Sequence, residues 1–147
     1  MNSEITISKQ NAIKKSIQYL NAMPFSKDGL ITQLEYEGFS YEDASYAVEN
    51  CGADWNEQAL KKAKQYLTVT AFSKEGLITQ LEYEKFSYEE ASYGVENCVA
   101  NWNRQAAKKA KEYLNVMAFS RAGLIAQLEY DKFTREQAKY GVLANGL

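Results

Sequence analysis

The sequence repeats itself three times with a period of 47 residues. Tyr46 recurs as Tyr93 and Tyr140, and an alignment of residues 12–58 with residues 59–105 gives 33 identical positions. Tandem repeats of this length fold as stacked supersecondary units, so the protein grows as an array. An array offers extended surface and not a single catalytic cleft. The period therefore favours a binding or structural protein.

The period divides the 147 residues into a short lead-in and three repeats. We place the lead-in at residues 1–11 and the repeats at residues 12–58, 59–105 and 106–147, the last of which is truncated. A unit of this size is close to the lower limit for an independent hydrophobic core. We therefore expect neighbouring repeats to share apolar surface.

The middle repeat predicts three helices. Apolar side chains recur at helical spacing over residues 55–69, directly after Asp54, whose side chain is a favourable N-cap. Ser73 is the expected cap of the second helix, and Ser87, three residues before Glu90, predicts a capping box at the start of the third. Because the link between the second and third helices is short, each repeat contains a helix–turn–helix corner. The predicted fold is all-α, with three tandem 47-residue helical repeats and nine helices.

The first helix of each repeat carries a predicted apolar stripe. In the second repeat this stripe begins at Trp55 and continues through Ala59 and Ala63. The first repeat lacks the tryptophan, and there we expect Ser8 to cap the helix. The stripe of that helix is predicted to consist of Ala12, Ile17 and Leu20.

The net charge of −2 conceals a gradient along the chain. Residues 12–58 contain three basic and eight acidic side chains, and residues 59–105 contain six of each. Residues 106–147 contain seven basic and four acidic side chains, so the last repeat is mildly basic. Either the partner surface is uneven, or exposed charges have drifted since the repeats were duplicated.

The residue types argue against catalysis and metal binding. The chain contains no histidine, and the pattern pairs no nucleophile with a base. Cys51 and Cys98 occupy equivalent positions one repeat apart, which is too far for a disulfide in a helical array, so we expect both to be small, buried, reduced side chains at helix ends. We predict a protein that is not an enzyme, with no cofactor and no metal site.

The sequence also bears on membranes and nucleic acids. No segment approaches the ~18–20 apolar residues of a membrane span, and the first residues lack the pattern of a secretory signal. We expect a soluble monomer, or an ectodomain whose signal and anchor were removed. The predicted corner helices begin with acidic residues that would repel phosphates, and only the last repeat, with Arg135 and Lys139, could approach DNA. We therefore expect no nucleic-acid partner.

A repeated acidic strip is the candidate partner-binding surface. Glu35 recurs as Glu82 and again as Glu129, and the pattern places these carboxylates on the second and third helices. Such a strip can dock a basic protein segment with an affinity that salt weakens, whereas the alternative is an ordinary solvated face. The candidate residues are Glu35, Glu37, Glu42, Asp43, Glu49, Glu82, Glu89 and Glu96.

The repeat resembles a known family. The resemblance rests on the segment Phe-Ser-Lys-Glu-Gly-Leu-Ile-Thr-Gln-Leu at residues 72–81, on Ala91-Ser92-Tyr93 and on the helix start Trp102-Asn103. These features are similar to the Ltp family of host-cell-surface-exposed lipoproteins, and the similarity extends over residues 8–147. It implies lipid-anchored, protein-binding repeats on the outer face of the cytoplasmic membrane of Gram-positive bacteria and their temperate phages.

The resemblance also implies a function. Phage-borne members mediate superinfection exclusion by blocking DNA injection, and the implied partner is the tape measure protein of the incoming phage. Such members carry a lipobox cysteine, whereas Cys51 and Cys98 lie inside repeats. Three hypotheses therefore stay open: superinfection exclusion, a general cell-envelope module that binds a host protein or wall polymer, and a DNA-binding helix–turn–helix protein.

Overall fold

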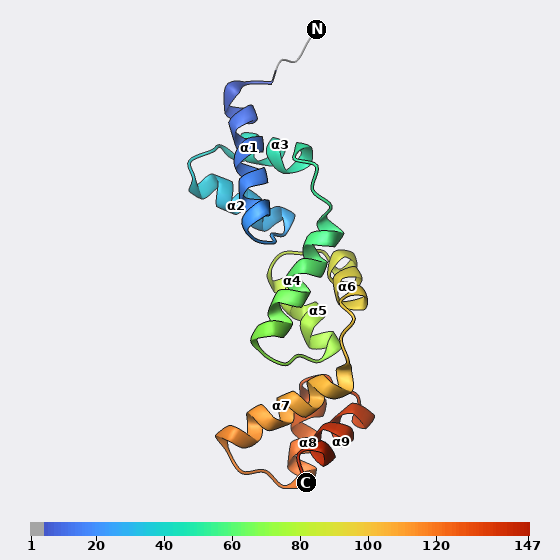
Figure 1. The fold of residues 1–147 in the computed structure, drawn as a ribbon. Coiled ribbons are helices and arrows are strands. Elements are labelled where there is room, and N and C mark those ends of the chain that lie inside the picture. The colour runs from blue at the N-terminus through green and yellow to red at the C-terminus, as the bar shows by residue number, and fades with distance from the viewer. Residues whose placement is uncertain (1–4) are drawn as a thin grey trace.

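The computed structural model describes residues 5–147, and within that range it contains helices and no strands. The helices form three bundles that follow one another along an elongated molecule (Figure 1). The predicted all-α repeat fold is confirmed. The elements are α1 (Ile7–Ala22), α2 (Lys27–Tyr36) and α3 (Tyr41–Asn50), then α4 (Trp55–Val69), α5 (Lys74–Tyr83) and α6 (Tyr88–Asn97), then α7 (Trp102–Val116), α8 (Arg121–Tyr130) and α9 (Arg135–Ala144).

The helix starts follow the predicted caps. The hydroxyl of Ser73 accepts a hydrogen bond from the amide of Gly76 at 3.0 Å. Ser87 and Glu90 form the reciprocal capping box at the start of α6. Each cap satisfies amide groups that the first helical turn leaves without a partner, which is why a helix begins at these positions.

The first helix differs from its prediction in two respects. Its N-cap is Thr6, whose hydroxyl oxygen accepts from the amide of Lys9, because the Ser8 hydroxyl instead donates to Asp43 at 2.6 Å. Ile17 is 43% exposed, and Ser16 takes the buried position in its place. The Ser16 hydroxyl is satisfied by the carbonyl of Ala12 at 2.9 Å, so burying it is tolerated.

Each repeat has its own hydrophobic core, and the expected sharing of apolar surface includes a tryptophan at each junction. In the second repeat Leu77 and Leu81 are fully buried against Ala59 and Ala63, and equivalent clusters fill the other repeats. Trp55 packs against the core of the first repeat, although it begins the first helix of the second repeat. Trp102 packs in the same way against the second core. One aromatic side chain therefore bridges each junction.

Polar contacts fix the junctions between repeats. The Ser26 hydroxyl caps α2 and also donates to the backbone carbonyl of Glu84 at 2.5 Å, just past the end of α5. The side-chain oxygen of Gln58 accepts from the amide of Phe25 at 3.1 Å. Ser73 and Gln105 repeat these two contacts at the second junction. The helices α8, α5 and α2 therefore meet end to start, an arrangement that their dipoles favour.

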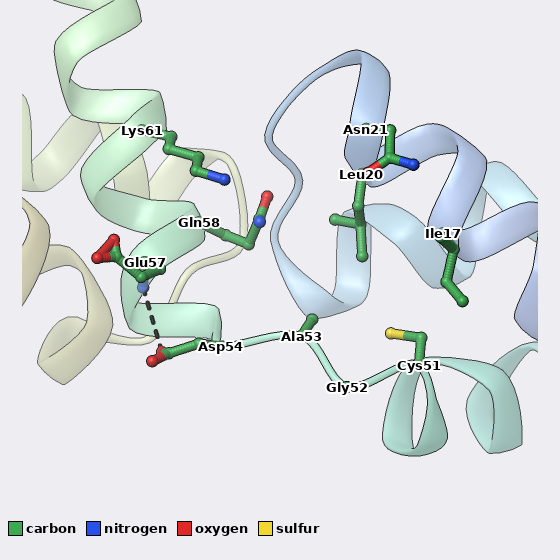
Figure 2. Close-up of a pocket in the computed structure, with 10 residues that line it drawn as sticks. All are labelled: Ile17, Leu20, Asn21, Cys51, Gly52, Ala53, Asp54, Glu57, Gln58 and Lys61. Carbon is green, nitrogen blue, oxygen red and sulfur yellow. Dashed lines mark hydrogen bonds between the residues drawn. The ribbon is translucent and has the colours of Figure 1, made fainter.

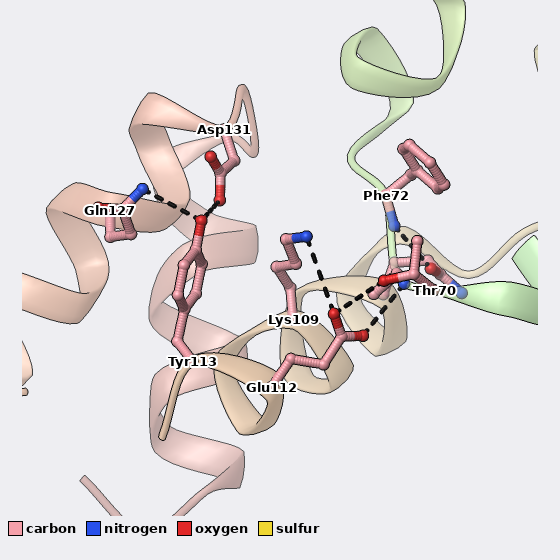
Figure 3. A network of polar contacts seen from close by, with 9 residues as sticks. Thr70, Phe72, Lys109, Glu112, Tyr113, Gln127 and Asp131 are labelled. Atoms are coloured by element: carbon pink, nitrogen blue, oxygen red, sulfur yellow. Dashed lines mark hydrogen bonds and ion pairs between the residues drawn. The ribbon is translucent and has the colours of Figure 1, made fainter. Parts of the chain in front are cut away.

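The second junction has an additional polar cluster around Glu112 (Figure 3). The carboxylate of Glu112 accepts from the Thr70 hydroxyl at 2.8 Å and from the amide of Ala71 at 3.2 Å. Close by, the Tyr113 hydroxyl donates to Asp131 at 2.5 Å and accepts from Gln127 at 3.1 Å. Tyrosine–carboxylate bonds of this kind tie the first helix of each repeat to the end of the second.

The bundles do not begin where the sequence period was divided. The boundary at residues 58 and 59 falls inside α4, and the boundary at residues 105 and 106 falls inside α7. A period determines the length of a repeat but not its starting point. Part of the lead-in at residues 1–11 already belongs to α1, and Met1–Glu4 lie outside the described residues.

The two cysteines are free, as predicted, and each follows the third helix of its repeat. Cys98 is buried, and this burial raises the pKa of its thiol. Cys51 is only half-buried, so the expectation of two buried thiols is met by one of them.

Candidate protein-binding site

The helix–turn–helix corner is the feature that positions the candidate side chains. In the second repeat, the chain turns between α5 and α6 through Lys85, which has a left-handed φ of 75°. The amide of Phe86 then bonds to the carbonyl of Leu81 at 3.1 Å, which closes the turn and buries the phenylalanine. The tight turn brings the end of α5 beside the start of α6, where Tyr83 and Tyr88 are 79% and 60% exposed.

Five of the eight predicted carboxylates are engaged within the chain. Glu37 accepts a hydrogen bond from the Tyr19 hydroxyl at 2.5 Å and pairs with Lys15 at 3.6 Å. The Tyr19 hydrogen bond, assisted by the Lys15 charge, lowers the pKa of Glu37. This carboxylate therefore has a structural partner and is less available to a ligand.

The same holds for the acidic residues near the end of the third helices. Glu49 pairs with Lys27, and their hydrogen bond raises the pKa of Lys27. Glu96 makes the equivalent pair with Lys74 at 2.6 Å. Both pairs join the second and third helices of a repeat, so reversing either glutamate would place two positive charges side by side.

The acidic residues in the first turn of α3 contact α1. Glu42 pairs with Lys9 at 3.4 Å, and Asp43 accepts from the Ser8 hydroxyl at 2.6 Å. In the first repeat these two residues therefore help to hold the helices together. Glu42 remains largely exposed, with 83% of its side chain accessible.

Three of the predicted carboxylates stay exposed without an internal cation. Among residues 5–147, Glu35, Glu82 and Glu89 take part in no ion pair and no side-chain hydrogen bond. Glu35 and Glu82 occupy equivalent positions one repeat apart. These glutamates are the members of the strip whose carboxylates face solvent without a partner among the described residues.

Glu82 lines a groove at the corner of the second repeat, which we call the corner groove. Its volume is about 200 Å³, and it is formed by Glu75, Ile78, Thr79 and Glu82 of α5 and by Tyr88 of α6. Glu75 and Glu82 are seven residues apart on one helix, so both carboxylates face the same side. The groove therefore combines two acidic side chains with an apolar floor and an aromatic wall.

The corner groove recurs in the third repeat with different chemistry. There it is lined by Arg121, Ala122, Ile125, Ala126, Glu129 and Arg135, with a volume of about 390 Å³. Arg135 stands at the position of Tyr88 and pairs with Glu129 at 3.1 Å. In the first repeat, the equivalent positions hold Asp28, Ile31, Thr32, Glu35 and Tyr41, which match the acidic composition of the second.

Sequence reasoning identified the glutamates of this groove but not the residues around them. Glu75 and Tyr88 were not among the candidate residues. A usable signal was present, because Glu75, Ile78 and Glu82 follow the spacing of one helix face. The short turn between α5 and α6 places Tyr88 against that face, and the spacing of residues along one helix does not predict the direction of the turn.

A second hollow lies at the junction of the first two repeats (Figure 2). Its volume is about 330 Å³, and Ile17 and Leu20 of α1 face Gln58 and Lys61 of α4 across it. Asp54 also lines it, but its carboxylate is committed to capping α4. Gln58 likewise has a partner in the amide of Phe25. These polar groups already serve the fold, so the corner groove remains the stronger candidate.

No helix within the described residues has the length and apolar character needed to cross a bilayer. A comparison with curated proteins finds no match to the chain. Among solved structures, the chain is similar to Ltp, a superinfection exclusion protein from the Streptococcus thermophilus temperate phage TP-J34. The two are 38% identical with a TM-score of 0.61, over 64% of this chain and 98% of the phage chain.

The model of the host cell surface-exposed lipoprotein family matches three times, at residues 8–51, 54–98 and 101–144. These segments coincide with the three helical bundles, which consist of α1 to α3, α4 to α6 and α7 to α9. Nearly the whole chain is therefore accounted for by the family pattern. The chain belongs to the family of host cell surface-exposed lipoproteins, in the Ltp type of repeat.

Proposed function

We propose that this protein mediates superinfection exclusion by binding a basic protein at its acidic corner grooves. Membership of the lipoprotein family and the similarity to a phage superinfection exclusion protein support the class of function. The observation that carries the binding surface is the pair Glu35 and Glu82, which recur one repeat apart without an internal cation among residues 5–147. Carboxylates in this state attract basic side chains, and binding such a side chain breaks no internal ion pair.

The proposed action requires binding of a partner and no catalysed reaction. The protein, held as a monomer at the outer face of the cytoplasmic membrane, captures the tape measure protein of an incoming phage and so blocks DNA injection. Two acidic repeats in one array engage a basic segment at two points, and the second contact forms at high effective concentration. Because the groups are exposed, this attraction should weaken as ionic strength rises.

The test is a charge reversal in cells that carry an anchored form of the chain. Glu35→Lys combined with Glu82→Lys should reduce protection against phage at least tenfold and restore phage DNA ejection, while the helical circular dichroism stays unchanged. The matched control is Glu57→Lys combined with Glu136→Lys, which alters net charge equally at exposed positions outside the corner grooves. This control should protect as well as the parent.

These two glutamates are preferred to Glu42 and Glu49, whose reversal would disrupt ion pairs with Lys9 and Lys27. Full protection by the Glu35→Lys, Glu82→Lys variant would refute the proposed surface. Equal loss in both double variants would show that overall charge matters and the grooves do not. Protection by neither the variants nor the parent would favour the alternative role of a general cell-envelope module.

A further inference from the structure

In the third repeat, the glutamate of the corner groove, Glu129, has a partner within the protein. Arg135, the first residue of α9, places its guanidinium 3.1 Å from the carboxylate of Glu129 on α8. Both side chains are partly exposed, so the pair lies at the rim of the corner groove and not in the core. The groove geometry is therefore compatible with a guanidinium beside this glutamate.

The second repeat keeps the glutamate but lacks the arginine. Glu82 is the counterpart of Glu129, and Tyr88 replaces Arg135. A second carboxylate, Glu75, replaces Ala122 on the same wall. Within residues 5–147 neither Glu75 nor Glu82 forms an ion pair, so the charge that balances Glu129 internally has no equivalent here.

We propose that the corner groove of the second repeat receives an arginine side chain of the partner protein, and that the α2–α3 corner of the first repeat, which has the same residue types, receives another. This inference rests on the proposed function and specifies which side chain the partner supplies. The guanidinium bonds to Glu82 as Arg135 bonds to Glu129, and Glu75 supplies a second carboxylate. The exposed ring of Tyr88 stacks on its planar face.

The chemistry of the groove favours arginine over lysine. A guanidinium is planar and presents several N–H groups, so it can contact two carboxylates and a ring at once, whereas an ammonium acts as a point charge. The floor at Ile78 suits the aliphatic part of the side chain. The groove volume of about 200 Å³ is below the roughly 300–1,000 Å³ of small-molecule sites, so it suits one side chain and not a metabolite.

The test measures binding to the isolated chain by NMR. The probe is the blocked peptide Gly-Gly-Arg-Gly-Gly, compared with versions that carry lysine or the neutral isostere citrulline. We expect the arginine peptide to shift amide signals at the α5–α6 and α2–α3 corners and to leave the third repeat unchanged. Binding of the lysine peptide should be several-fold weaker, and binding of the citrulline peptide at least tenfold weaker.

Exchanging residues between repeats gives the matched variants. Tyr88→Arg copies the third repeat into the second and should abolish the shifts at α5–α6 while those at α2–α3 persist. The reverse change, Arg135→Tyr with Ala122→Glu, should make the third groove responsive. Because each variant installs a residue that the equivalent position already accommodates, folding is retained, and an unchanged dispersion of amide signals checks this.

The outcomes separate this inference from the proposed function. Equal shifts with arginine and lysine peptides, or shifts spread over all acidic residues, would overturn the arginine groove. A silent third groove in the Arg135→Tyr, Ala122→Glu variant would overturn it as well. If the arginine peptide fails to bind but Glu35→Lys with Glu82→Lys still abolishes protection, the groove inference fails and the proposed function stands. If the arginine peptide binds but the Glu35→Lys, Glu82→Lys variant still protects fully, the groove inference stands and the proposed function is rejected.

Discussion

Replacing Gly94 with alanine tests how closely the first and third helices of a repeat pack. Gly94 lies on α6, and a Cβ atom there would lie 2.7 Å from the carbonyl carbon of Ala59 and 2.8 Å from its oxygen. These atoms belong to the backbone of α4, which cannot rotate away as a side chain can. Carbon atoms pack at about 3.5–4.0 Å, so the helices must separate by about 1 Å.

Two effects of opposite sign determine the result. Alanine is favoured over glycine inside a helix by about 1 kcal/mol. Forcing an extra methyl group into a packed contact costs about 1–3 kcal/mol, and the rigid neighbour places Gly94 toward the upper end of that range. We therefore expect Gly94→Ala to lower the free energy of unfolding by about 1–2 kcal/mol.

Urea unfolding provides the assay. Trp102 packs against the core of the second repeat, so in a Trp55→Phe background its fluorescence reports the repeat that contains Gly94. Circular dichroism of the same samples reports the whole array. We expect the fluorescence midpoint to fall while the dependence on denaturant stays the same, since the surface exposed on unfolding hardly changes.

The first repeat supplies the control, because Ala47 occupies the equivalent position and is fully buried there. Its helix pair already accommodates the methyl group, so Ala47→Gly should also destabilise, by about 1 kcal/mol from lost helix propensity and the void left behind. Each repeat should thus prefer its own residue. A higher midpoint for Gly94→Ala would mean that propensity outweighs the close approach, and the reasoning would be refuted.

Two further perturbations follow from backbone geometry and from titration. Val99 has a left-handed φ of 56° and is 92% exposed, and the equivalent residue of the first repeat is Gly52. Val99→Gly should therefore raise the free energy of unfolding in urea by about 1 kcal/mol, and a decrease would contradict the assumed strain. Burial and the hydrogen bond to Asp131 raise the pKa of Tyr113 to about 12, so the protonated tyrosine is favoured in the folded state. The stabilisation from Tyr113 is complete below the unfolded pKa of about 10 and is lost as the pH rises from there to about 12. Tyr113→Phe should remove this contribution from unfolding curves across that range and leave that of Tyr66, whose pKa burial also raises.

Local signals explain why the helices could be predicted from the sequence. Ser73 and Ser87 bond to amides three residues away, so the information for a helix start lies within one turn of chain. Ser8, the predicted cap of the first helix, instead donates to Asp43, which lies 35 residues further along, and Thr6 caps the helix. A local pattern cannot include such a competitor.

Long-range packing explains what the sequence could not supply. Trp55 follows the helical spacing of its own repeat, yet its ring packs against the preceding core, because the chain direction changes between α3 and α4. The internal partners of Glu37, Glu49 and Glu96 are likewise set by how helices meet. The repeated acidic strip was therefore visible in the sequence, whereas the division between structural and free carboxylates was not.

The structure also bears on the two interpretations of the charge gradient. Random drift would spread substitutions over the exposed surface without regard to the corner groove. Five exchanges make the third repeat more basic: Glu75 to Ala122 and Tyr88 to Arg135 fall within that groove, whereas Glu90 to Gln137, Ser92 to Lys139 and Glu96 to Leu143 lie outside it. The exchange of Tyr88 to Arg135 introduces the guanidinium that neutralises Glu129. Most of the gradient therefore lies outside the groove, as drift would give, whereas the exchange at Tyr88 changes what the groove itself can bind, so both interpretations stay open.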